Sequence, residues 1–181
     1  YWYFIRLMGK DPSHLALECA LKTHPNMVII SEESAFRGET LPDIVNRIAD
    51  VVQERSAQNK NYGSVLIPEG LMNHVSAYKH LIDELNQLFS KCLTVEDKQA
   101  LCQKLYKEDT HVKSLLSPWS FSLFQTLPDF MKLQLINEQE ISGEVNLSQI
   151  ETEKLLAFFV SEEIEKRKKA GVFKGSFAPV T

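Results

Sequence analysis

A chain of 181 residues has the length of one ordinary domain and is long enough to bury a core. Its hydrophobic fraction of 44% and charged fraction of 24% are typical of globular proteins. The net charge of -4 argues against a broadly basic nucleic-acid-binding surface, although an anionic ligand needs only local positive groups. Three widely spaced cysteines predict neither a disulfide framework nor a zinc site, and they favour a reducing compartment.

The beginning of the chain indicates a part of something longer. No run has the length of a bilayer span and none has the pattern of a signal peptide. The first residue is not Met and already lies inside a strand-like apolar run. We therefore expect a fragment of a cytoplasmic protein that binds neither nucleic acid nor membrane.

The first secondary-structure signal is a strand that leads into a helix. Residues 1–7 are rich in aromatic and β-branched side chains, which fit a strand. After the turn at 8–10, Asp11 has the type of an N-cap residue and Pro12 suits the first helical position, so we expect a helix over 13–22. Backbone N–H groups at such a turn are free to bind a ligand, whereas the simpler interpretation is an ordinary tight turn relieved by Gly9.

Two further strands follow with a helix between them. Residues 27–30 and 64–67 are continuous apolar runs, typical of strands covered on both faces. Thr40 and Asp43 form a capping box, and an apolar stripe at helical spacing runs from there to residue 55. The order strand, helix, strand, helix, strand predicts a parallel βαβαβ unit and therefore an α/β fold.

Ligands of such sheets bind outside the carboxyl ends of the strands. The turns at 8–10, 31–33 and 68–70 meet at that edge. Glu69 stands there between a proline and a glycine, so its carboxylate is placed either to accept hydrogen bonds from sugar hydroxyls or to cap the following helix. The residues alone do not separate these two interpretations.

From His74 onward the chain has helical spacing, and we expect no further strand there. We divide the chain into an α/β portion, 1–73, and a mainly helical subdomain, 74–181. The features expected in the helical part are helix starts at Thr94, Ser117–Pro118 and Leu127–Pro128, a polar loop over 137–146, a last helix over about 148–170 with basic residues at 166–169, and Gly171 as its C′ residue. A solvated helix end explains that basic run better than an anion site.

Several common chemistries are absent from the sequence. The five histidines show no metal-ligand spacing. No G-x-S-x-G elbow, Walker A motif or G-x-G-x-x-G motif occurs. The sequence therefore predicts no metal site and no familiar nucleotide cradle.

Several segments of the sequence resemble those of a known protein family. The segment from Tyr3 to Lys10 is similar to the segment around the M-G-R motif of phosphofructokinases, and more closely to their long pyrophosphate-dependent type. The ordered blocks that carry the resemblance are residues 3–10, 13–19, 23–33, 66–70, 116–120 and 147–156. A lone M-G-K would carry no weight, but these blocks cover most of the chain in consistent order.

The resemblance implies a phosphofructokinase-type Rossmann-like domain and a 6-phosphofructokinase reaction of glycolysis. In that reaction a phosphoryl group from pyrophosphate, or from ATP, is transferred to the C1 hydroxyl of fructose 6-phosphate with Mg²⁺. Carried over residue by residue, Met8, Gly9, Lys10 and Glu69 become the substrate contacts. The family also implies a homo- or hetero-oligomeric parent protein.

Two departures from the family pattern matter. Lys10 stands where the motif has arginine, and lysine is a point charge without the bidentate fork. The family's T-I-D catalytic aspartate and its glycine-rich donor loop would lie upstream of Tyr1, and its Y-x-x-R motif would lie beyond Thr181. We therefore assign no catalytic residue within this chain and expect the isolated chain to be inactive.

Three interpretations remain at this stage. The chain is a central part of a catalytic phosphofructokinase of the pyrophosphate type, or it belongs to a regulatory, non-catalytic unit on the same fold. Lys10 is the feature that raises the second interpretation. The third interpretation is an unrelated α/β binding module.

Overall fold

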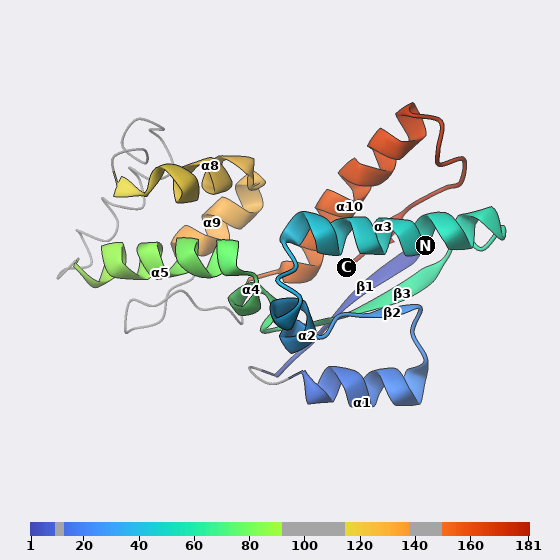
Figure 1. The fold of residues 1–181 in the computed structure, drawn as a ribbon, viewed down its shortest axis with the longest axis horizontal. Coiled ribbons are helices and arrows are strands. Elements are labelled where there is room, and N and C mark those ends of the chain that lie inside the picture. Colours follow the sequence, from blue (N-terminus) through green and yellow to red (C-terminus); the bar gives the residue numbers. More distant parts are fainter. Residues whose placement is uncertain (10–12, 92–114, 138–149) are drawn as a thin grey trace. The chain divides into compact units, whose positions relative to one another are not determined.

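The computed structural model describes residues 1–9, 13–91, 115–137 and 150–181 (Figure 1). Within them the chain forms two compact units, one of residues 1–75 with 152–181 and one of residues 76–151. The expected division into domains at 1–73 and 74–181 stays a prediction. That division places residues 152–181 in the second part, whereas in the structure they group with the first unit.

The first unit is built on a four-stranded parallel sheet in the order β2-β3-β1-β4. Its strands are β1 (Trp2–Leu7), β2 (Met27–Val28), β3 (Gly63–Pro68) and β4 (Pro179–Val180). β1 and β3 pair along their whole length, from Trp2 opposite Gly63 to Leu7 opposite Pro68. The predicted α/β class and parallel βαβαβ unit are confirmed.

The expectation that strands stop before His74 is wrong. β4 adds to the far edge of β1, with Trp2 opposite Pro179 and Tyr3 opposite Val180. The two residues of β4 are exposed, so no buried apolar run marks them in the sequence. They form a strand because they pair with the edge of β1.

Five helices belong to the first unit: α1 (His14–Thr23), α2 (Ser31–Phe36), α3 (Leu41–Ala57), α4 (Leu71–His74) and α10 (Thr152–Lys169). In Figure 1, α1 lies on one side of the strands and α3 with α10 on the other. β1 alternates accordingly: Trp2 and Phe4 are buried and both contact Phe177, whereas Tyr3 and Ile5 are exposed. The buried face of β1 is therefore the one toward α3 and α10, whereas β3 is buried along nearly its whole length.

Local capping explains where these helices begin and end. The Thr40–Asp43 capping box is present in full at the start of α3, as predicted. The N-cap of α1 is Ser13 and not Asp11, which lies outside the described residues with Pro12. After α10, Gly171 has a φ of 74°, the left-handed conformation expected of a C′ glycine.

The second unit contains the helices α5 (Ser76–Ser90), α8 (Pro118–Thr126) and α9 (Asp129–Asn137). α8 begins as predicted at Pro118, with the Ser117 hydroxyl accepting from the N–H of Ser120. α9 begins just after Pro128. The helix expected from Thr94 and nearly all of the loop expected over 137–146 lie outside the described residues.

The helices in the described ranges are each too short or too polar to cross a lipid bilayer.

Candidate functional site

The carboxyl ends of β1, β2 and β3 lie at one edge of the sheet, because all three strands run parallel. Met8 and Gly9 follow β1, Ser31 begins α2 shortly after β2, and Glu69 follows β3 directly. Figure 1 shows α2 and α4 beside these strand ends. This is the edge at which the sequence placed a ligand site.

Gly9 and Glu69 are joined by a hydrogen bond at this edge. The Gly9 N–H donates to Oε2 of Glu69 over 2.6 Å, and the Glu69 N–H donates to the carbonyl oxygen of Leu7 over 3.1 Å. The side chain of Glu69 is buried, with 6% of its surface exposed. Gly9 has a φ of 150°, which side-chain-bearing residues rarely adopt, so a glycine is needed to present this N–H.

The other two predicted substrate contacts are Met8 and Lys10. Met8 is adjacent to Gly9 with 58% of its surface exposed, so its side chain faces solvent. Lys10 lies outside the described residues. The structure therefore brings Gly9 and Glu69 together at the strand ends with Met8 beside them, and the substrate-binding role of all four residues stays a prediction.

A second set of contacts joins the turn after β1 to the turn after β2. The Ser13 N–H donates to Oε1 of Glu32 over 2.8 Å, and the Ser31 N–H donates to the Ser13 hydroxyl over 3.0 Å. Ser13 and Ser31 are both buried. Burial on its own would raise the pKa of Glu32, but the hydrogen bonds from the Ser13 backbone and hydroxyl, with the nearby charge of His74, lower it below its ordinary value.

His74 approaches the same region from the end of α4. Its Nδ1 lies 3.0 Å from the carbonyl oxygen of Gly70, a contact that requires a proton on Nδ1. α4 also contacts α2, so the chain after β3 packs on the chain after β2. The spacing of the histidines in the sequence gave no sign of this placement, because His74 contacts Gly70 and influences Glu32, neither of which is a histidine.

The sequence pointed to the turn at 31–33, but it did not predict the hydrogen bonds that Glu32 and Ser13 form. The signal for Glu32 was its position just after the apolar run at residues 27–30, of which 27–28 form the half-buried strand β2. Ser13 carried no such signal, because its partners lie 18 and 19 positions further along the chain.

A cavity of about 400 Å³ runs along the outer edge of β1. Its lining includes Arg6, Met8 and Glu153 at the end nearest the candidate site. Arg6 Nε and Glu153 Oε2 form an ion pair of 3.4 Å between β1 and α10. This pair places a guanidinium close to the turn that carries Met8 and Gly9.

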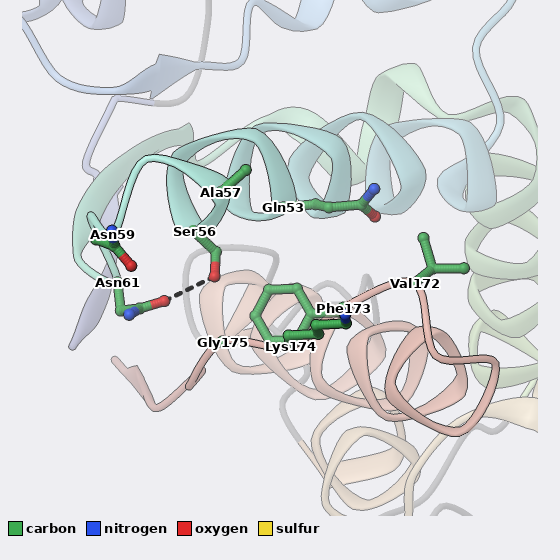
Figure 2. A pocket seen from close by; sticks show the side chains of 9 residues that line it. All are labelled: Gln53, Ser56, Ala57, Asn59, Asn61, Val172, Phe173, Lys174 and Gly175. Carbon is green, nitrogen blue, oxygen red and sulfur yellow. Dashed lines mark hydrogen bonds between the residues drawn. The ribbon is translucent and has the colours of Figure 1, made fainter.

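Another cavity, of about 330 Å³, lies at the opposite end of the strands. Figure 2 shows the side chains that line it, among them Gln53, Asn59 and Lys174, and the 2.8 Å hydrogen bond between the hydroxyl of Ser56 and the side-chain oxygen of Asn61. These residues precede β3 and β4 or belong to α3 and the segment after α10, so this cavity is separate from the edge at Gly9 and Glu69.

The described part of the chain contains no group of three or more His, Cys, Asp or Glu side chains that could hold a metal ion. What the edge offers is backbone N–H donors and two carboxylates, Glu32 and Glu69, from different strand ends. Such groups can hydrogen-bond to hydroxyls, because N–H groups donate and carboxylates accept.

No family model matches the chain. It is 44% identical over 175 residues, 97% of its length, to pyrophosphate--fructose 6-phosphate 1-phosphotransferase subunit alpha 1 of Arabidopsis thaliana. It is 41% identical over its whole length to pyrophosphate--fructose 6-phosphate 1-phosphotransferase of Porphyromonas gingivalis, and 36% identical over 99% of its length to the protein of that name from Treponema pallidum.

The chain spans between about a quarter and a third of these relatives: 26% of the Arabidopsis protein, 32% of the Porphyromonas protein and 31% of the Treponema protein. The similarity nevertheless extends over nearly every residue of the chain itself. Over nearly its whole length, the sequence of this chain therefore matches one segment of pyrophosphate-dependent phosphofructokinases.

Proposed function

We propose that this chain is the sugar-phosphate-binding part of a longer enzyme that transfers a phosphoryl group from pyrophosphate to the C1 hydroxyl of fructose 6-phosphate. The observation that carries the proposal is that the relatives matched over 97–100% of the chain are named for this reaction. The product is fructose 1,6-bisphosphate, as in glycolysis, and a cytoplasmic location goes with it.

The chemistry at the strand ends supports this substrate class. Glu69 is a buried carboxylate, and carboxylates accept hydrogen bonds at two oxygens with about four lone-pair sites in all. The bond from Gly9 uses one of these sites, so acceptor capacity remains for sugar hydroxyls. In this proposal Glu69 binds the sugar, while Met8, Gly9 and Lys10 form the turn that receives its phosphate.

Phosphoryl transfer depends on positioning and on neutralising the charge of the transferred group, which Mg²⁺ supplies in such enzymes. The described residues offer no group of three or more His, Cys, Asp or Glu side chains that could hold a metal ion, so this proposal assigns the Mg²⁺ to other parts of the longer enzyme. The base and the donor-binding loop are likewise assigned to the parts of the longer enzyme outside this chain.

The test is a coupled assay with fructose 6-phosphate and Mg²⁺, in which pyrophosphate and ATP are offered separately. We expect the full-length protein to turn over with pyrophosphate and the isolated chain to be inactive. Turnover of the isolated chain at the full-length rate would overturn the partial-site proposal. Turnover with ATP alone would replace pyrophosphate as the donor.

A regulatory subunit on the same fold is the second candidate, and Lys10 is the observation that favours it. The comparison does not separate the two, because the chain is 44% identical to a relative named subunit alpha and 41% identical to one named subunit beta. These names also lead us to propose an oligomeric parent protein. Full-length protein that binds fructose 6-phosphate without turning it over would favour the regulatory role.

A further inference from the structure

Ser13 connects two strand-end turns through both its backbone and its side chain. Its N–H donates to Glu32 over 2.8 Å, and its hydroxyl accepts from the N–H of Ser31 over 3.0 Å. Only 7% of Ser13 is exposed, and 1% of Ser31. The chain after β1 is therefore hydrogen-bonded to the chain after β2, through a buried bond from Ser31 and a part-buried bond to Glu32, which is itself exposed.

The hydroxyl of Ser13 is not used as an ordinary helix cap. Ser13 occupies the N-cap position of α1, yet its side chain makes no capping hydrogen bond to that helix. The hydroxyl contacts the beginning of α2 instead. Its role is thus to fix one turn against another rather than to stabilise its own helix.

The chain that follows β1 is also hydrogen-bonded to the end of β3. Gly9 donates its N–H to Glu69 over 2.6 Å. The chain on either side of residues 10–12 is thus held by a carboxylate from another strand end: Glu69 binds Gly9 before them and Glu32 binds Ser13 after them. Hydrogen bonds to a charged acceptor are stronger than those between neutral groups.

We infer that Ser13 and Glu32 are positioning residues for Met8 and Gly9, the described part of the proposed phosphate-binding turn, and that they act through the backbone and not through contact with the substrate. The inference rests on the proposed function. Small displacements of a binding turn are costly, because recognition and transfer both depend on placement to within about 0.5 Å. Losing either residue removes a hydrogen bond that holds the chain at Ser13, while the bond between Gly9 and Glu69 stays in place.

The experiment compares variants of the full-length protein in the pyrophosphate assay. Ser13→Ala and Glu32→Ala each remove one connection, whereas Glu32→Gln keeps an oxygen that accepts from the Ser13 N–H. Ser34→Ala is the matched control for the serine, because Ser34 is also buried and its hydroxyl has no hydrogen-bond partner among the described residues. Glu33→Ala is the control for the carboxylate, since Glu33 is likewise exposed and, among the described residues, pairs with Arg37 at the C-cap of α2.

We expect Ser13→Ala and Glu32→Ala to raise KM for fructose 6-phosphate by about fivefold or more with kcat changed less, the pattern of weakened substrate binding. Glu32→Gln and both controls should stay within about twofold of wild type. A KM unchanged in both alanine variants, or raised equally by the controls, would overturn the inference.

Hydrogen exchange of the Gly9 amide provides a readout that does not depend on activity. If the positioning role is right, the Gly9 N–H exchanges faster in Ser13→Ala and in Glu32→Ala than in the controls. If the wild-type protein does not turn over fructose 6-phosphate, the proposed function is overturned. The exchange rate of the Gly9 amide then decides by itself whether Ser13 and Glu32 hold this part of the chain in place. Unchanged exchange would overturn that role as well.

Discussion

Gly9 and Glu69 are 60 positions apart in the chain, and the N–H of the first donates to the carboxylate of the second over 2.6 Å. The parallel pairing of β1 with β3 produces this contact, because it brings Leu7 opposite Pro68 and so places the next residues side by side. A buried carboxylate at such a position needs a donor, and Gly9 supplies one without a side chain in the way.

Removing the carboxylate of Glu69 should weaken the use of the sugar phosphate. For Glu69→Ala in the full-length protein we expect a loss of about 1–3 kcal/mol in transition-state binding, a fall of roughly 5- to 150-fold in kcat/KM for fructose 6-phosphate. The measurement is steady-state kinetics with pyrophosphate held at saturation. Kinetics equal to wild type would remove Glu69 from the proposed site.

Lys10→Arg tests the one departure from the family motif within the site. If the missing bidentate fork limits phosphate binding, this variant should lower KM for fructose 6-phosphate. The assay is the same, with Lys22→Arg as the control, because Lys22 is exposed and, in the part of the chain that the structure describes, pairs with Glu18 on the same helix. An unchanged KM would mean that backbone N–H groups dominate phosphate recognition at this turn.

The elements that the sequence predicted correctly are those with a strong local pattern. The stripe that includes Ile44, Ile48 and Val52 is buried in α3, and the apolar run of β3 is a buried strand. The capping box at Thr40 is likewise a local motif, complete within four residues. Periodicity and local hydrogen bonding are present in the sequence itself, which is why these predictions were confirmed.

The features that could not be predicted depend on distant partners. β4 is a strand only because β1 offers it an edge, and α2 is a short helix of mixed composition at a place where only a turn was expected. At the candidate site, topology predicted that Glu69 would meet the turn after β1, but nothing in the sequence pairs Ser13 with Glu32. Such contacts follow from the packing of three strand ends, which no local pattern encodes.

Gly63 lies so close to Trp2 that even a methyl group does not fit. A Cβ at this position would lie 2.5 Å from Cζ3 of Trp2, whose ring is fully buried and therefore has no room to move. We expect Gly63→Ala to reduce the free energy of unfolding by about 1–3 kcal/mol, the usual range for overpacking. Urea unfolding measures the loss, and a smaller loss on a Trp2→Phe background would show that the indole ring causes it.

Acid should weaken the connection between Ser13 and Glu32. Although burial opposes it, hydrogen bonding from Ser13 lowers the folded-state pKa of Glu32 below 4.5, so the unfolded state binds the proton more readily. The contribution of Glu32 to stability is therefore present above pH 4.5 and is lost as the pH falls through the folded-state pKa.

The check is to compare wild type with Glu32→Ala by urea unfolding at neutral pH and at successively lower pH. The difference in free energy of unfolding should be largest at neutral pH and should shrink below pH 4.5, because a protonated Glu32 no longer offers Ser13 a charged acceptor. Glu33→Ala in parallel separates this effect from the general loss of carboxylate charge near α2. A difference that grows in acid would mean that Glu32 is not held by Ser13 in the folded protein.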